Sequence, residues 1–229
     1  EVMVNPYRIA PLTAVIRSGG YVVKNASVRI VPKQNGQEIR YSVSDENVRT
    51  AGGIPVFGLY PDWLNTVEVE YDRVFNGKTE HFSDRYQLYA APVFLRSNGT
   101  PGQTHTTFNV KVLKMDPAFK DRLYFINNLI PTPPDASRVV WNNPMGGALE
   151  WAFGPENAIV DSTGTVRWYL NPDVEMYDPD QPYKAGIMMG FEQTADGGLL
   201  FGYGQRYAKY DMTGREIFNR RLPMGYADY

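Results

Sequence analysis

Two histidines, His81 and His105, have the broadest chemistry in this chain, because an imidazole can act as a base, a nucleophile or a metal ligand. His81 lies in the alternating run Thr79–Ser83, which predicts a strand with the histidine facing solvent. His105 follows a loop rich in Gly, Pro and Thr. Neither has a serine, cysteine or carboxylate at a spacing that would form a nucleophile–base pair. We therefore predict a structural role for both and no catalytic residue in this chain.

Two loops resemble ligand-binding motifs only superficially. The acidic stretch Asp173–Asp180 offers oxygen ligands for calcium, but it lacks the spacing and central glycine of an EF-hand loop, which favours a solvated loop. The stretch Gly202–Arg206 is rich in glycine, but no Lys-Ser/Thr pair or helix follows it, as a phosphate-binding loop would require. The sequence predicts no metal site and no cofactor.

The second half of the chain contains an internal repeat, in which residues 153–164 align with residues 203–214. Five of the twelve positions are identical at a constant offset of 50 residues: Gly154/Gly204, Ala158/Ala208, Asp161/Asp211, Thr163/Thr213 and Gly164/Gly214. A period of about 40–50 residues with short strands is typical of β-propeller blades. A closed ring needs roughly 4–8 blades. We therefore expect an incomplete propeller whose remaining C-terminal segment is either missing or supplied by a separate chain, as a nicked C-terminal piece or a separately encoded subunit.

The innermost strand of a propeller blade lines the central channel, where ligands bind. In the second copy this strand is expected to run from about Lys184 to Phe191, into the turn Thr194–Gly197. Met188 and Phe191 are therefore the candidate substrate-binding residues. Trp168 could stack on an aromatic or sugar ligand, but an aromatic residue also stands at the matching position of the second copy, Phe218, and this favours packing between sheets.

Residues 1–92 show the alternation of half-buried antiparallel strands. Val28 and Ile30 share one face of their predicted strand, and Val67, Val69 and Tyr71 share one face of another. Strands at a spacing of about 8–12 residues predict a small Ig-like β-sandwich. The predicted fold class is all-β, with a sandwich domain over residues 1–92, followed over residues 93–229 by connecting strands and the first blades of a propeller.

Turn signals and short runs complete this prediction. The pairs Asn35-Gly36 and Asn76-Gly77 favour tight hairpins, because both residue types tolerate positive φ. In the connecting region we predict strands over Thr106–Met115 and Arg122–Asn127, with a helical turn around Asp116–Phe119.

Composition excludes several classes of function. The net charge of −2 provides no basic surface for nucleic acid. No apolar run approaches the roughly 18 residues that cross a bilayer, so we predict no membrane span. The chain has no cysteine, which excludes a disulfide framework.

Five stretches of the sequence resemble bacterial arylsulfate sulfotransferases, the periplasmic enzymes that use no nucleotide sulfate donor. They follow one another in the same order as in that family and span nearly the whole chain: Asn5–Ala14, Gly53–Pro61, Glu156–Asp161, Val166–Leu170 and Leu199–Gly204. The resemblance implies an N-terminal β-sandwich followed by a six-bladed propeller. It also implies transfer of a sulfuryl group from a phenolic sulfate ester to a phenol through a sulfated histidine, without a cofactor.

The family's catalytic histidine and its supporting residues lie in later blades, and neither His81 nor His105 matches one of those positions. The resemblance therefore implies that this chain is the N-terminal portion of the enzyme and is inactive without the rest of the propeller. It further implies a periplasmic location and a homodimer of the complete enzyme. Because the first residue is Glu1 and not Met, we expect that an upstream segment has been removed, either as a secretory signal peptide, which the periplasmic location implies, or by other trimming of the N-terminus.

Two other functions are open at this point. The β-sandwich could be a non-catalytic binding or dimerisation module, which predicts an autonomous monomer or dimer that needs no further segment. A propeller hydrolase of another family would need paired carboxylates facing the channel, and no such pair can be placed from the sequence.

Overall fold

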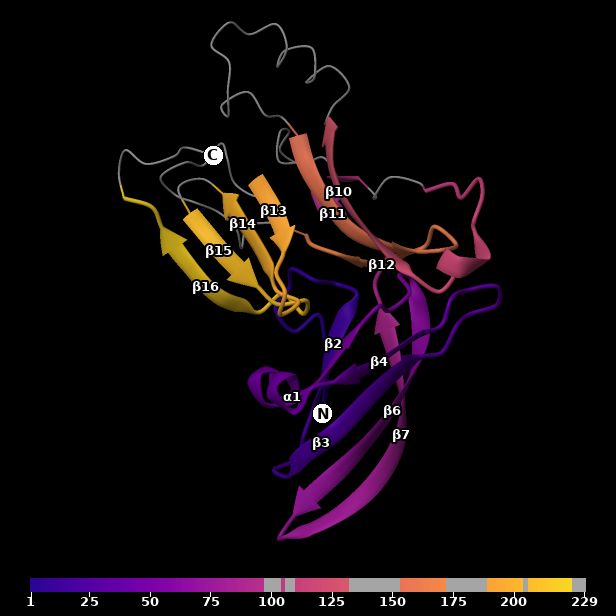
Figure 1. Ribbon diagram of the computed structural model, residues 1–229, viewed down its shortest axis with the longest axis vertical. Coiled ribbons are helices and arrows are strands. Elements are labelled where there is room, and N and C mark those ends of the chain that lie inside the picture. Colours follow the sequence, from indigo (N-terminus) through magenta and orange to yellow (C-terminus); the bar gives the residue numbers. More distant parts are fainter. Residues whose placement is uncertain (97–103, 106–109, 132–152, 172–188, 204–205, 224–229) are drawn as a thin grey trace, which may run out of the picture. The chain divides into compact units, whose positions relative to one another are not determined.

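The computed structural model describes residues 1–96, 104–105, 110–131, 153–171, 189–203 and 206–223 (Figure 1). These residues form antiparallel sheets with one short α-helix, so the predicted all-β class is confirmed. The chain divides into two compact units. Unit 1 contains Glu1–Val93, Asn109–Phe125 and Ala158–Tyr169, and unit 2 contains Phe94–Phe108, Ile126–Asn157 and Leu170–Tyr229. The domain boundary predicted at residue 92, the Ig-like topology and the propeller stay predictions.

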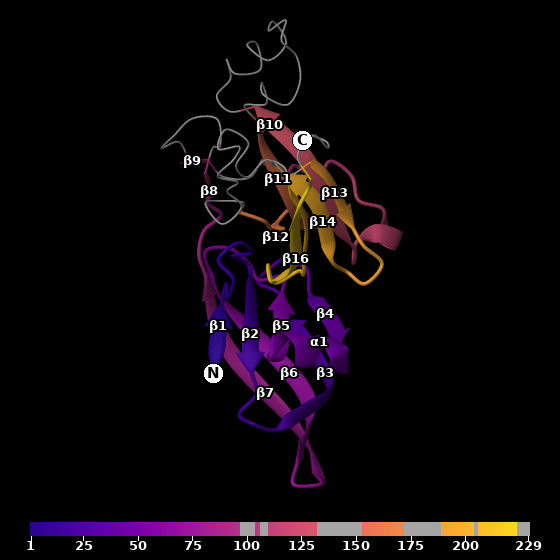
Figure 2. The ribbon, with the colours of Figure 1, turned by 90° about the vertical axis from the view of Figure 1, so that its left-hand side faces the viewer.

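The N-terminal part of unit 1 consists of two antiparallel sheets and a helix. In Figure 2 the three-stranded sheet, in the order β1-β2-β5, lies in front of the four-stranded sheet, in the order β4-β3-β6-β7. The elements are β1 (Val2–Val4), β2 (Thr13–Arg17), β3 (Val22–Ile30), β4 (Ile39–Val43), α1 (Asp45–Ala51), β5 (Gly53–Phe57), β6 (Trp63–Phe75) and β7 (Lys78–Ala90).

The core of these two sheets follows the alternation in the sequence. Val28 and Ile30 of β3 are fully buried, as are Val67 and Val69 of β6. Glu70, which follows Val69 in β6, is exposed. Fully burying an aliphatic side chain of this size is favourable by about 1.5–3 kcal/mol. The predicted inward and outward faces of these two strands are confirmed.

The two Asn-Gly pairs behave differently. Asn76 and Gly77 have φ of 48° and 76° and join Phe75 to Lys78, so the predicted tight hairpin is confirmed. At Asn35-Gly36 the tight hairpin is wrong, because β3 and β4 are joined by the longer loop 31–38. In that loop Asn35 has φ of 60°, whereas Gly36 leaves space for the Tyr60 hydroxyl oxygen, with which a Cβ at this position would collide.

Helix α1 lies in a region where the sequence predicts only strands and turns. The Ser44 side chain accepts a hydrogen bond from the Asn47 amide at 3.1 Å, which caps the first turn. Gly52 ends the helix in the left-handed conformation with φ of 68°. Both signals are present in the sequence, but seven residues are too few to show a helical period.

The connecting region confirms two of its three predicted elements. A 3-10 turn spans Pro117–Phe119, and strand β10 (Leu123–Pro131) begins one residue after the predicted start. The strand predicted over Thr106–Met115 is wrong for residues 110–115, the described part of it, which carry no strand. Leu113 is 86% exposed there, so the apolar residues in this run do not mark a buried strand face.

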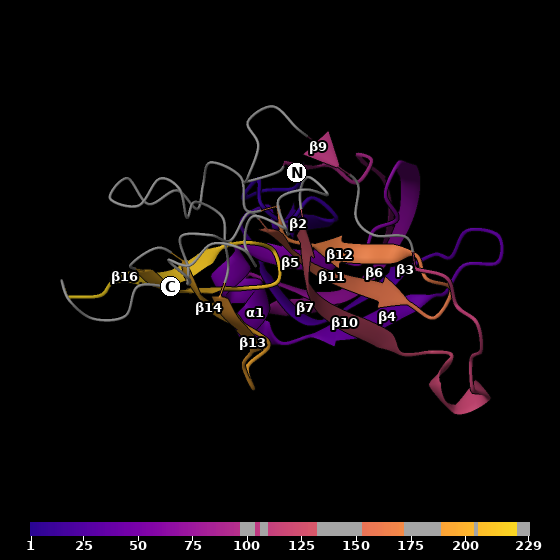
Figure 3. The same cartoon turned by 90° about the horizontal axis from the view of Figure 1, so that it is seen from above.

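Two further sheets contain the internal repeat. Strands β10, β11 (Phe153–Asp161) and β12 (Val166–Tyr169) form an antiparallel sheet in that order, and Figure 3 shows β11 and β12 side by side. In unit 2, four strands form an antiparallel sheet in sequence order: β13 (Met189–Gln193), β14 (Leu199–Tyr203), β15 (Arg206–Tyr210) and β16 (Glu216–Arg221). Unit 2 also has a two-stranded ladder of β8 (Leu95–Arg96) and β9 (Thr104–His105).

Tyr41 joins strands of the two N-terminal sheets. Its hydroxyl accepts a hydrogen bond from the Phe57 amide at 2.8 Å and donates one to the Pro55 carbonyl at 3.2 Å. Burial raises the pKa of the Tyr41 phenol above its ordinary value of 10.0. Because the unfolded phenol ionises at a lower pH than the folded one, this contribution to stability is present below about pH 10 and is lost as the pH rises further.

We expect Tyr41→Phe to lower the free energy of unfolding by about 1–3 kcal/mol at pH 7, because the Phe57 amide loses its acceptor. We also expect the variant's stability to fall less steeply than the wild type's above pH 10. Urea unfolding at pH 7 and pH 11 measures both effects. Equal pH sensitivity of the two proteins would show that the Tyr41 phenol is not held neutral by the fold.

Candidate functional site

A group of polar side chains in unit 1 makes hydrogen bonds around the β11–β12 hairpin. Asp161, the last residue of β11, organises the turn with one carboxylate oxygen. Its Oδ1 accepts the Thr163 amide at 3.0 Å, the Thr163 hydroxyl at 2.6 Å and the Thr165 amide at 3.1 Å. Gly164 supplies the left-handed position with φ of 85°. Asp161 therefore holds the main-chain N–H groups of the turn, and Gly164 provides its left-handed residue.

The second oxygen of Asp161 binds a buried guanidinium. Arg167 lies in β12, and its Nη1 donates to Asp161 Oδ2 at 2.8 Å, with both side chains 0% exposed. Removing two charges from water is costly, and their attraction offsets this cost only where further hydrogen bonds are made. Arg167 makes two, from Nε to the Gly58 carbonyl at 3.0 Å and from Nη1 to the Gln37 carbonyl at 2.9 Å.

The Arg167 guanidinium also stacks on the Tyr60 ring, with its central carbon 3.6 Å from the ring centroid. Burial raises the pKa of the Tyr60 phenol, while the positive charge of Arg167 acts in the opposite direction. The Tyr60 hydroxyl donates to the Gln37 carbonyl at 2.8 Å, so that carbonyl accepts from both side chains. The cation–π contact and these shared acceptors fix the guanidinium in one orientation.

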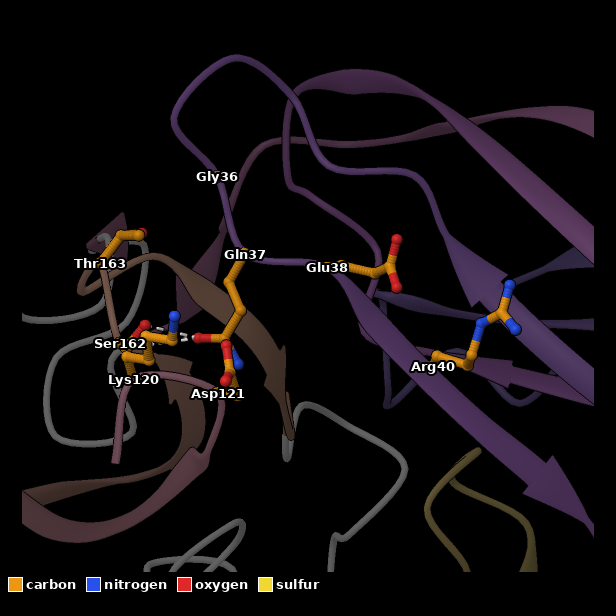
Figure 4. Close-up of a pocket in the computed structure, with 8 residues that line it drawn as sticks. All are labelled: Gly36, Gln37, Glu38, Arg40, Lys120, Asp121, Ser162 and Thr163. Atoms are coloured by element: carbon orange, nitrogen blue, oxygen red, sulfur yellow. Dashed lines mark hydrogen bonds between the residues drawn. The ribbon is translucent and has the colours of Figure 1, made fainter. Parts of the chain in front are cut away.

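Gln37 connects three segments of unit 1 through its side chain. Its Oε1 accepts from the Ser162 amide at 2.8 Å and from the Ser162 hydroxyl at 2.7 Å (Figure 4). Its Nε2 donates to the Arg122 carbonyl at 3.2 Å. The side chain therefore joins the loop between β3 and β4, the residue that precedes β10 and the β11–β12 turn.

An open pocket of about 470 Å³ lies beside Gln37. Its lining residues carry both signs of charge: Gly36, Gln37, Glu38, Arg40, Lys120, Asp121, Ser162 and Thr163. Figure 4 shows Gln37 and Ser162 pointing toward one another, with Arg40 at the far end of the pocket.

The geometry of this pocket does not provide an activated nucleophile. The Ser162 hydroxyl donates to an amide oxygen, which is not a base, so its proton is not withdrawn. The Glu38 carboxylate is engaged by Arg29 at 2.6 Å. The contacts around Ser162 and Gln37 therefore hold segments together and do not activate a reacting group.

The sequence predicts two substrate-binding candidates, Met188 and Phe191. Met188 lies outside the described residues. Phe191 is a half-buried residue of β13 whose ring stacks on Phe201 with centroids 5.5 Å apart. The described residues do not test whether Phe191 lines a channel, so this assignment stays a prediction.

The structure describes the side chain of one of the two histidines that the sequence analysis considered. His81 lies in β7 with its side chain 67% exposed and Nδ1 3.0 Å from Asp72 Oδ1, so its predicted solvent-facing position is confirmed. His105 is described only as a backbone position of β9, and Asp173–Asp180 lies outside the described residues. Among the described residues, no group of three or more His, Asp or Glu side chains is arranged to hold a metal ion. No helix in the described part of the chain is long and apolar enough to cross a membrane.

The fold and these contacts define an all-β protein in which an N-terminal pair of sheets is joined to a repeated hairpin by buried polar contacts. Two family models match the chain: an arylsulfotransferase Ig-like domain over residues 1–91 and arylsulfotransferase (ASST) over residues 109–229. This chain belongs to the arylsulfotransferase family.

Two curated relatives are similar to nearly the whole chain. Each is an arylsulfate sulfotransferase AssT, one from Escherichia coli O6:H1 and one from Lelliottia amnigena. Each is 32% identical over 243 aligned residues, which cover 99% of this chain and 39% of the relative. The chain therefore spans about two fifths of the length of the curated relatives it matches, and the resemblance identified in the sequence is confirmed at the level of the family.

Proposed function

We propose that this chain is the N-terminal portion of an arylsulfate sulfotransferase that moves a sulfuryl group from a phenolic sulfate ester to a phenol. The observation that carries this proposal is the family match over residues 109–229, together with 32% identity to two arylsulfate sulfotransferases over 99% of the chain. The four-stranded sheet β13–β16, antiparallel and in sequence order, has the form of one propeller blade and supports the same architecture.

The proposed reaction has two steps on one histidine. An imidazole nitrogen attacks the sulfur of the donor ester, the S–O bond to the aryl oxygen breaks, and the donor phenol leaves with a proton. The acceptor phenol then loses its proton and attacks the same sulfur, and the N–S bond breaks to regenerate the histidine. Fixed cationic and hydrogen-bonding groups stabilise the charge on the transferring oxygens.

We propose that the nucleophilic histidine is supplied by sequence outside these 229 residues. His81 is the histidine whose side chain is described, and it projects from the exposed face of β7 next to Asp72. An exposed imidazole of this kind is neither desolvated nor surrounded by groups that would stabilise a transferring sulfuryl group. The partners of this chain are then a C-terminal propeller segment, an aryl sulfate donor and a phenol acceptor.

We also propose a periplasmic location and a homodimer of the complete enzyme, both on the basis of the family. The alternative of a separate sandwich module is less well supported, because unit 1 includes Asn109–Phe125 and Ala158–Tyr169 in addition to the N-terminal sheets. A detachable module would not be expected to hold these later segments with buried polar contacts.

The assay mixes the purified chain with 4-nitrophenyl sulfate and phenol and follows the release of 4-nitrophenolate. We expect no release above the uncatalysed rate from the chain alone, and turnover when the chain is co-expressed with the proposed C-terminal propeller segment. His81→Ala should leave that turnover unchanged. Turnover by the chain alone would contradict the proposed location of the nucleophile, and an inactive co-expressed protein would contradict the proposed reaction.

A further inference from the structure

The two copies of the internal repeat differ at the positions that contact the N-terminal region. At the offset of 50 residues, the turn residues Asp161, Thr163 and Gly164 recur as Asp211, Thr213 and Gly214. Ser162 and Arg167 do not recur, because Met212 and Ile217 stand at the corresponding positions.

The shared residues are sufficient to form the turn. In the second copy, Asp211 Oδ1 accepts the Thr213 amide at 2.9 Å, the Thr213 hydroxyl at 2.6 Å and the Arg215 amide at 3.0 Å. Gly214 has φ of 87°. This is the pattern already described for the first turn, and it forms without a serine or an arginine at the two differing positions.

The second copy also neutralises its aspartate, but from within its own turn. Arg215 Nε donates to Asp211 Oδ2 at 2.9 Å, and the two side chains are 29% and 27% exposed. Arg167 serves the same role for Asp161 with both side chains fully buried. Charge neutralisation of the turn aspartate therefore does not require an arginine that is buried against the N-terminal sheets.

Ser162 and Arg167 also contact residues that lie more than 100 positions earlier in the chain. Ser162 bonds the Gln37 side chain through both its amide and its hydroxyl, and Arg167 bonds the carbonyls of Gln37 and Gly58 across 130 and 109 residues. These contacts all lie within unit 1.

The surface that receives them is held in place by its own bonds. The Tyr60 amide donates to Asn65 Oδ1 at 2.7 Å, and the Tyr60 hydroxyl holds the Gln37 carbonyl at 2.8 Å. Gly58 has φ of 89°, and a Cβ there would lie 2.7 Å from Ile39 Cδ1, so a glycine is required to present its carbonyl in this way. Two carbonyls and one aromatic face are thus set to accept a planar guanidinium.

We propose that Gln37, Gly58 and Tyr60 form a docking surface for one hairpin of the repeat, Asp161–Tyr169, and that Ser162 and Arg167, which the second copy lacks, are the residues of this hairpin that bind it. The N-terminal region, residues 1–93, is then a clamp that holds the first repeat of the arylsulfotransferase region, and not a separable domain. This inference is independent of the reaction proposed above.

Amide hydrogen exchange of the complete 229-residue chain tests the clamp in two variants. Gln37→Ala removes the acceptor of the Ser162 amide but keeps the Asp161–Arg167 pair, and we expect that amide to exchange roughly tenfold faster. Ser162→Met combined with Arg167→Ile places the second copy's residues at these two positions of the first hairpin. For this variant we expect exchange over Asp161–Tyr169 to be faster by on the order of a hundredfold, with β13–β16 unchanged.

Gln34→Ala is the matched control, because Gln34 lies in the same loop as Gln37 but is exposed. We expect it to leave exchange at Ser162 unchanged. Equal effects of Gln34→Ala and Gln37→Ala would overturn the proposal, as would wild-type protection of the first hairpin in the double variant. Equal loss of protection in β13–β16 of the double variant would also count against a contact that is specific to the first hairpin.

Discussion

Replacing Arg167 by methionine is expected to lower the free energy of unfolding by about 3–5 kcal/mol, the largest effect we expect for a single polar residue of this chain. The substitution keeps much of the side-chain volume but leaves the Asp161 carboxylate, which is 0% exposed, without its cation. It also removes the donors that Gly58 and Gln37 bind with their carbonyls. Urea unfolding of the complete chain, followed by circular dichroism, measures the loss.

Two further variants separate the buried pair from an ordinary ion pair. Arg215→Met removes the equivalent partner of Asp211, and because that pair is partly exposed we expect a loss below about 1 kcal/mol. In the double variant Asp161→Asn/Arg167→Met, part of the stability should return, because no uncompensated charge is left buried. Equal losses for Arg167→Met and Arg215→Met would contradict the structural role of the buried pair.

The strands of the N-terminal sheets were predictable because their physical signal is local. The residues of β3 and β6 alternate between apolar and polar side chains, and this period places Val28, Val67 and Val69 on the buried face. The turn at Asn76-Gly77 was predictable for a similar reason, since both residue types accept the positive φ that a two-residue hairpin needs. Neither inference requires knowledge of distant residues.

The contacts of Arg167 were not predictable from the sequence. An arginine within a short strand is ordinarily expected on an exposed face, because a charged side chain is rarely buried without partners. Its partners here include two main-chain carbonyls. Because every residue has such a carbonyl, the sequence does not show which ones accept a hydrogen bond from Arg167. The one available signal was the mismatch between Arg167 and Ile217 in the repeat, and a single mismatch does not identify a contact.

The strand predicted over Thr106–Met115 shows the limit of local patterns. Val110 and Val112 alternate with Lys111, which is the sequence of a half-buried strand. In the described part, residues 110–115 form no strand, and Leu113 is almost fully exposed. The alternation of apolar and polar residues indicates which face of a strand would be buried. Whether the strand forms depends on pairing with a neighbouring strand, which the local sequence does not specify.

Trp168 provides the second large expected effect, and it tests whether an aromatic residue of the repeat packs or binds a ligand. Its side chain is fully buried, and its ring centroid lies 6.2 Å from that of Phe125 at an interplanar angle of 36°. We expect Trp168→Ala to lower the free energy of unfolding by about 3–5 kcal/mol, the usual cost of deleting a buried tryptophan side chain. The measurement is urea unfolding under the conditions used for Arg167→Met.

Phe218 occupies the matching position of the second copy and gives the comparison. It is half-buried, with Tyr207 at a centroid distance of 6.3 Å and Arg220 above its ring at 5.2 Å. Because Phe218 buries less surface than Trp168, we expect Phe218→Ala to lower the free energy of unfolding by about 1–2 kcal/mol. A loss below about 1 kcal/mol for Trp168→Ala would mean that the ring contributes little to packing, and the ligand-stacking role would then have to be reconsidered. The two residues have the same place in the repeat, and the expected ordering follows from the fuller burial and the larger side chain of Trp168.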